Sequence, residues 1–201
     1  MKKINKIIIG TRNDGKFKEI CDLLPKNIIK ISTKDLNLFT PDEIGSTFEE
    51  NSKIKAEYFA KKANLIAISD DSGLSIDILS GAPGIYSSRW AGPTNDFNIA
   101  IEKVYNELKK IKFEWNKRKG IIARFISCLT LHWPNGKFIS STGIVEGRIS
   151  EIKKGTNGFG YDPIFIPFGY NKTFAELKPQ EKLKIDHRSR AFSKISNLFI
   201  N

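Results

Sequence analysis

Two adjacent acidic residues, Asp70 and Asp71, follow the apolar run at 65–68 after a single serine. We expect a strand to end at this point and Gly73 to let the backbone turn. Carboxylates at the end of a strand can hold a cation or a water molecule. The same residues also suit an ordinary solvated turn, because Asp, Ser and Gly are common there. The rest of the chain has to decide between a site and a turn.

A possible anion site lies near the N-terminus. An apolar strand at 4–9 leads into the loop 10–16, and a helix with an apolar stripe at 17, 20, 21 and 24 follows. The free N–H groups at such a helix start, together with Lys16, could hold a phosphate. In the alternative, Asn13 only caps the helix and Lys16 points to water. The loop matches neither a P-loop nor a dinucleotide fingerprint.

Two further segments carry groups suited to a nucleotide. Three glycines surround Phe159 in the stretch 155–163, which could present the ring to a base, although the ring could equally pack into the core. Lys182, His187 and Arg188 precede a closing helix and offer donors for phosphate oxygens or for the carbonyl edge of a base.

The remaining elements would position these groups. The spacing of Thr47 and Glu50 predicts a capping box that opens a helix with its apolar face at 56, 59, 60 and 63. The loop before that helix carries Glu43, which could be a metal ligand only if the fold brings it near Asp71.

The second half of the chain contains the other predicted elements. They are an ordered loop at 81–90, a helix between 97 and 111, an exposed connection at 113–120, a hairpin of strands 120–132 and 137–146, and a strand at 164–166. His132 ends a strand with no acid or cysteine nearby, so we expect a structural or surface role for it.

Length and composition restrict the class of protein. A chain of 201 residues predicts one domain over 1–201. The net charge of +11 suggests an anionic partner, but the basic residues are scattered and no nucleic-acid-binding motif accompanies them. We therefore favour a solvated basic surface. No apolar run approaches a membrane span, and Cys21 and Cys128 are isolated, which predicts a soluble, cytoplasmic protein without disulfides.

Several separated motifs together resemble one family. In chain order they are Thr11-x-Asn13-x-x-Lys16-x-x-Glu19, Thr47-Phe48-x-Glu50-Asn51, Asp70-Asp71-Ser72-Gly73-Leu74, the stretch 81–87, Gly158-Phe159-Gly160-Tyr161-Asp162-Pro163 and His187-Arg188. This order resembles the inosine/xanthosine triphosphate pyrophosphatases, which act on non-canonical purine nucleotides. Asp186 and Ser189 stand where that family commonly has Ser and Gly.

The resemblance implies an α/β fold, in which an elongated mixed β-sheet with flanking helices forms two lobes around a deep central cleft. It also implies a homodimer and a Mg²⁺-dependent reaction in which ITP, dITP or XTP and water give the monophosphate and pyrophosphate. Two alternatives stay open: a basic nucleic-acid-binding module, and a pyrophosphatase of other modified nucleotides.

The resemblance also assigns roles to individual residues. Asp71 is the general base and, with Glu43, a metal carboxylate; Asp70 supports the turn or the outer shell of the metal. The expected substrate contacts are Thr11, Arg12, Asn13, Asp14, Gly15 and Lys16 for the triphosphate, Ser72, then Phe159, Gly160, Tyr161, Asp162 and Lys182 along the nucleotide, and His187 and Arg188 at the 6-oxo edge of the base.

Overall fold

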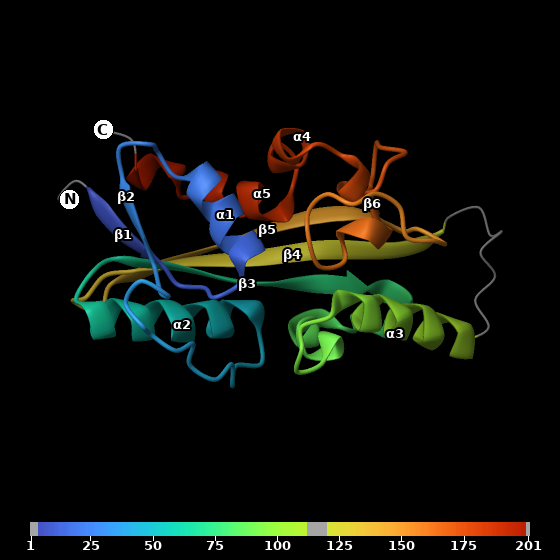
Figure 1. Ribbon diagram of the computed structural model, residues 1–201, viewed down its shortest axis with the longest axis horizontal. Coiled ribbons are helices and arrows are strands. Elements are labelled where there is room, and N and C mark those ends of the chain that lie inside the picture. Colours follow the sequence, from blue (N-terminus) through green and yellow to red (C-terminus); the bar gives the residue numbers. More distant parts are fainter. Residues whose placement is uncertain (1–3, 112–119, 200–201) are drawn as a thin grey trace. The chain divides into compact units, whose positions relative to one another are not determined.

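The computed structural model describes residues 4–111 and 120–199, and it contains a mixed six-stranded sheet with the strand order β2-β1-β3-β4-β5-β6 (Figure 1). The strands are β1 (Lys6–Ile9), β2 (Ile29–Ser32), β3 (Ala67–Ile76), β4 (Ile121–His132), β5 (Phe138–Ile149) and β6 (Phe165–Pro167). The helices are α1 (Asp14–Leu23), α2 (Phe48–Ala63), α3 (Phe97–Lys110), α4 (Pro179–Leu183) and α5 (His187–Ser193). β1 pairs in parallel with β2 and β3, while β5 and β6 are antiparallel. The predicted α/β class and mixed sheet are confirmed.

The chain divides into two compact units. The first comprises Met1–Asp71, Ser127–Gly143 and His187–Asn201, and the second comprises Ser72–Ile126 and Ile144–Asp186. Each unit has its own apolar core. The single domain over 1–201 and the two lobes around a central cleft stay predictions.

In the first unit, helices cover both faces of the sheet, and the alternation along β1 explains why. Ile8 packs against Phe59 of α2, whereas Ile7 and Ile9 lie in the cluster that contains Ile20 of α1 and Ala191 of α5. Figure 1 shows α2 on one side of these strands and α1 and α5 on the other. A strand buried on both faces reads as a continuous apolar run, as residues 7–9 do.

The expectation that a strand ends at the acid pair is wrong. β3 continues through Asp70, Asp71 and Gly73 to Ile76, so the aspartates lie in the middle of a strand and Gly73 makes no turn there. The strand continues because Leu74 and Ile76 are fully buried in the core of the second unit. Apolar alternation therefore resumes after the polar residues.

Most other predicted elements are confirmed. Asn13 caps α1 and Thr47 caps α2, each accepting a hydrogen bond from the N–H three residues later, and the turn at 133–137 joins β4 to β5. The loop at 81–90 is ordered by short 3₁₀ turns and by the Ser87 hydroxyl, which accepts from the Leu74 N–H at 2.9 Å. The apolar residues Ala191, Ile195 and Leu198 predicted one continuous closing helix, but the helix ends at Ser193 and a 3₁₀ turn follows.

Three other expectations concern the described part of the chain. Cys21 and Cys128 are both free thiols, as predicted. His132 is buried and stacks on Phe138, which confirms a structural role. Within residues 4–111 and 120–199, no helix has the length and apolar character that a membrane crossing requires. The expected exposed connection at 113–120 falls almost entirely outside the described residues.

Candidate active site

In the first unit, a buried lysine on α2 joins two carboxylates. Lys55 Nζ lies 3.1 Å from Asp71 Oδ1 and also contacts Glu43 Oε1. Lys55 and Asp71 are each only 4% exposed. Asp71 is delivered by β3 and Glu43 by the loop that precedes α2, so the fold does bring the two predicted metal carboxylates together.

Asp71 has the electrostatic character of a base. Burial raises the pKa of its carboxyl group; Glu43 and Asp70 add to the rise, while Lys55 and Lys16 oppose it. Its second oxygen, Oδ2, is buried and has no hydrogen-bond partner among the described residues. A buried carboxylate with a raised pKa and a free oxygen is a good acceptor for a proton from water.

Asp70 belongs to a different network on the same strand. Its carboxylate contacts Lys16 Nζ at 2.9 Å, Arg188 Nε and Nη2 at 3.3 Å each, and the Ser127 hydroxyl at 2.5 Å. Burial alone would raise the pKa of Asp70, but Arg188, Lys16 and the Ser127 hydrogen bond hold it well below its ordinary value. Asp70 is therefore a buried structural anion at neutral pH.

The loop before α1 confirms the predicted cap, the expectation that Lys16 points to water is wrong, and binding of an anion stays a prediction. Asn13 caps the helix by accepting from the Lys16 N–H at 2.9 Å, and Thr11 Oγ1 accepts from the Asn13 N–H at 3.1 Å. The Lys16 side chain is 17% exposed and pairs with Asp70 rather than pointing to water. Arg12 and Asp14 are exposed, and Gly15 is half-buried. The loop thus contains one largely buried ammonium, Lys16, and one exposed guanidinium, Arg12.

The carboxylates suit Mg²⁺ better than a metal with many protein ligands. The described residues contain no group of three or more His, Cys, Asp and Glu that could hold a metal. Mg²⁺ commonly uses one or two carboxylates and completes its shell with water and substrate phosphate. Glu43 and Asp71 share a single ammonium, and Asp71 Oδ2 is free, so this pair fits such an ion.

The second unit holds the aromatic part of the predicted site. The ring of Phe159 is half-buried, and the Lys182 ammonium lies 5.0 Å from its centroid. The buried Asp162 accepts from Lys182 Nζ at 2.6 Å and from the Phe159 N–H at 2.9 Å. A Cβ on Gly158 would lie 2.0 Å from Asp162 Oδ2. The ring is therefore neither free of the protein nor part of the core, and a carboxylate fixes its loop.

Other predicted substrate contacts have structural partners of their own. Tyr161 is buried, donates to the Ser87 carbonyl at 3.0 Å and packs edge-on against Phe97. Ser72 is half-buried at the start of the second unit. His187 and Arg188 open α5 in the first unit and are buried, and the Arg188 guanidinium also pairs with Glu19. Their base-reading roles stay predictions.

Sequence reasoning missed Lys55 and gave no role to Glu19. The signal for Lys55 was available in the helix period: it lies four residues after Asn51 and four before Phe59, in the buried stripe of α2. A lysine within a buried stripe needs an anionic partner. For Glu19 the pairing with Arg188 spans 169 residues of sequence, and no local pattern predicts it.

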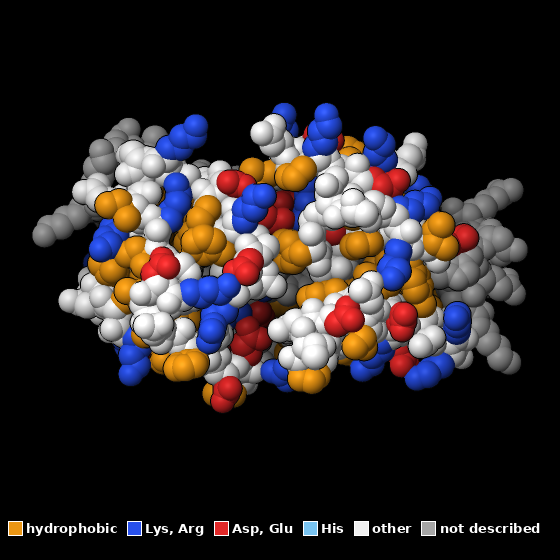
Figure 2. Space-filling view, viewed as in Figure 1, with side chains coloured by type: hydrophobic (Ala, Val, Ile, Leu, Met, Phe, Trp, Pro, Cys, Tyr) orange, Lys and Arg blue, Asp and Glu red, His pale blue; other side chains and the backbone are white. Residues whose placement is uncertain are grey.

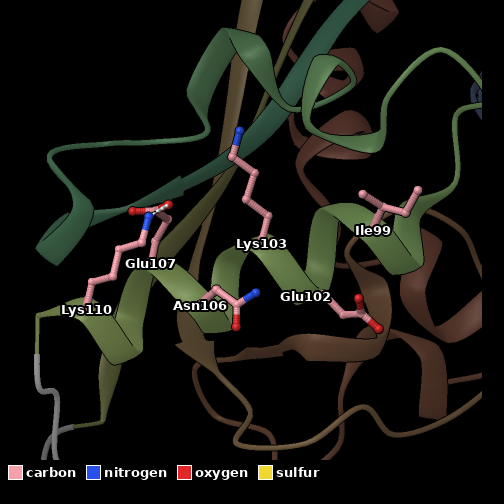
Figure 3. Close-up of a pocket in the computed structure, with 6 residues that line it drawn as sticks. All are labelled: Ile99, Glu102, Lys103, Asn106, Glu107 and Lys110. Carbon is pink, nitrogen blue, oxygen red and sulfur yellow. Dashed lines mark hydrogen bonds and ion pairs between the residues drawn. The ribbon is translucent and has the colours of Figure 1, made fainter.

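Two surface features lie outside this machinery. A hollow of about 580 Å³ lies on α3 and is lined by Ile99, Glu102, Lys103, Asn106, Glu107 and Lys110 (Figure 3). Lys110 and Glu107 form an ion pair of 2.7 Å there, and none of the lining residues was a predicted contact. On the face shown in Figure 2, lysine and arginine side chains are interspersed with acidic ones rather than gathered in a patch.

Comparison with known proteins gives a consistent result. The Ham1 family model matches residues 7–198. The dITP/XTP pyrophosphatase of Rhodospirillum centenum is 43% identical over 190 residues, which cover 94% of this chain and 92% of the relative. The dITP/XTP pyrophosphatase of Agrobacterium fabrum is 44% identical over 200 residues, with 94% and 92% covered. A HAM1 protein from Coxiella burnetii superposes with a TM-score of 0.84 at 37% identity and covers 96% of this chain and 97% of its own.

Proposed function

The chain belongs to the Ham1 family, and from this premise we propose that it hydrolyses dITP, XTP and ITP to the nucleoside monophosphate and pyrophosphate. It is accordingly a hydrolase of nucleotide metabolism that acts on an acid anhydride and removes non-standard purine nucleotides from the pool. The observation that carries the proposal is the buried Asp71, whose Oδ2 is free while its Oδ1 is held by Lys55.

The residues of the first unit suit the chemical step. Asp71 Oδ2 can accept the proton of the attacking water, and the raised pKa of this carboxyl group makes it a stronger base than an exposed aspartate. Lys16, the exposed edge of the 11–16 loop and the positive end of α1 can balance the charge of the phosphates.

We propose Mg²⁺ as the cofactor, held by Glu43 and Asp71. When bound, it would neutralise the charge that develops on the phosphate oxygens. The support is the pairing of these two carboxylates on a single ammonium, which places them close to each other.

We propose that hydrogen-bond donors of the protein recognise the base by its 6-oxo group. His187 and Arg188 carry N–H donors, and a 6-amino group would leave such donors unpaired. For Phe159 we propose stacking on the base, supported by its half-buried ring in a loop fixed by Asp162. We also propose that the chain forms a homodimer and that it acts in the cytoplasm, because its motifs resemble those of the inosine/xanthosine triphosphate pyrophosphatases.

The direct test is a panel of nucleoside triphosphates assayed with Mg²⁺ and with product identification. We expect pyrophosphate rather than orthophosphate from dITP, XTP and ITP, with kcat/KM far above that for ATP and GTP. Asp71→Asn should lower the rate of release by about 10²- to 10⁴-fold. No turnover with any triphosphate would overturn the proposal, and tight, salt-dependent oligonucleotide binding that survives Asp71→Asn would favour the nucleic-acid alternative.

A further inference from the structure

The segment 40–46, which carries Glu43, has no helix or strand to hold it in place. Packing does not anchor it either, because the neighbouring Ile44 side chain is 84% exposed. A carboxylate on such a segment would adopt many positions unless polar contacts fixed the backbone. The position of Glu43 beside Asp71 therefore requires an explanation from specific hydrogen bonds.

The first turns of α2 supply those contacts. The amide oxygen of Asn51 accepts from the Gly45 N–H at 2.8 Å, and Asn51 itself is 1% exposed. One turn further along the same helix face, Lys55 holds the Glu43 carboxylate. One face of α2 thus binds the segment both at Glu43 and two residues after it.

Gly45 shows how closely the segment lies on the helix. A Cβ built on Gly45 would stand 2.6 Å from the Glu50 Cβ, 2.7 Å from Asn51 Oδ1 and 3.0 Å from the Asn51 nitrogen. Two of these neighbours belong to the helix backbone or to the root of a side chain, so they cannot move aside. Only glycine permits this approach, which brings the Gly45 N–H within reach of Asn51.

We infer that Asn51 is a positioning residue for Glu43: its side-chain amide holds the Gly45 backbone on α2 and thereby presents the Glu43 carboxylate beside Asp71. The inference rests on the proposed function, because it takes Glu43 as a metal carboxylate. Removal of a residue that orients a metal ligand commonly weakens metal binding by about 10- to 100-fold.

The test measures Mn²⁺ affinity by electron paramagnetic resonance in the absence of nucleotide. Asn51→Ala removes the amide oxygen that accepts from the Gly45 N–H, and Gly45→Ala adds a methyl group that pushes the Gly45 backbone away from α2. We expect each to weaken Mn²⁺ binding by about 10- to 100-fold. The control is Ile44→Ala, which alters an exposed side chain next to Glu43 and should leave the affinity unchanged.

Combination with Glu43→Gln separates positioning from a general effect on folding. If Asn51 acts through Glu43, Asn51→Ala should weaken Mn²⁺ binding no further in the Glu43→Gln background. Full additivity, or wild-type affinity in both Asn51→Ala and Gly45→Ala, overturns the inference. Should Asn51→Ala fail to fold, Gly45→Ala still carries the test, since it leaves the Asn51 side chain in place.

Failure of the inference and failure of the proposed function give different results. A chain that releases pyrophosphate from dITP while Asn51→Ala binds Mn²⁺ normally keeps its function and loses this inference. If Glu43→Gln leaves Mn²⁺ affinity unchanged, the assignment of Glu43 as a metal carboxylate falls, and the role of Asn51 falls with it.

Discussion

Asp70 and Asp71 are neighbours on β3, yet their carboxylates lie in separate ion-pair networks of the first unit. Asp70 contacts Lys16 and Arg188, whereas Asp71 contacts Lys55. Successive strand residues point to opposite faces of the sheet, which explains the separation. The pKa of Asp70 is lowered and that of Asp71 is raised, so a single dipeptide provides one fixed anion and one base.

The first prediction concerns the pH dependence of hydrolysis. Asp71 must be ionised to accept a proton, so activity is lost as pH falls through its pKa; burial raises that pKa in the metal-free chain, and a bound Mg²⁺ would lower it. The pH profile of kcat/KM should show this acidic limb. Asp71→Asn should lower kcat by about 10²- to 10⁴-fold. Its Tm should not fall, because burial disfavours the charge that is removed; a large drop in Tm would mean that lost folding explains the lost activity.

The second prediction concerns Lys55. Its ammonium lowers the pKa of Asp71, so Lys55→Met should raise that pKa further and move the acidic limb of kcat/KM to higher pH. At neutral pH we expect a loss of about tenfold or more, the usual effect of removing a partner that orients a functional group. Lys61→Met on the exposed side of α2 is the matched control. An unshifted limb in Lys55→Met would show that Lys55 does not act through Asp71.

The third prediction concerns stability at low pH. The pKa of Asp70 is depressed in the folded chain, so its ionisation stabilises the fold above the pKa of the unfolded state, and this stability is lost as pH falls through the folded value. Asp70→Asn removes the buried charge that pairs with Lys16 and Arg188, and should lower the free energy of unfolding at neutral pH by about 3 kcal/mol. Urea denaturation of both proteins at neutral and acidic pH checks this. An equal difference at both pH values would contradict it.

The periodicity of the sequence predicted the elements well, because helix caps and apolar stripes are local signals. The N-cap residues Asn13 and Thr47 and the hairpin turn at Asn135-Gly136 all depend on neighbours within a few positions. The predicted end of β3 was wrong because it does not depend on local signals alone. Whether a strand continues past two aspartates depends on partners such as Lys16, Lys55 and Arg188, which lie far away in the sequence.

The residues of the candidate site were largely predictable from the sequence, but the ion pairs between them were not. The resemblance assigned roles to Glu43, Asp71 and Lys16, and the structure brings Glu43 to Asp71. Lys55, whose ammonium joins Glu43 and Asp71, belongs to none of the motifs, although its position in the helical repeat of α2 matches the buried face. The burial of Arg188 against Asp70 and Glu19 depends on tertiary packing alone.

The last prediction concerns Phe159 in the second unit. If its ring stacks on the base, Phe159→Ala should raise KM for dITP by about tenfold or more, because stacking on an aromatic side chain contributes about 1–3 kcal/mol per base. Phe159→Tyr keeps a flat ring and should restore most of the affinity. Phe168→Ala removes an exposed ring elsewhere in the same unit and should leave KM unchanged. A normal KM for Phe159→Ala would assign this ring to the packing of its own loop, where the Lys182 ammonium lies over the ring and the Asp162 carboxylate accepts from the Phe159 backbone N–H.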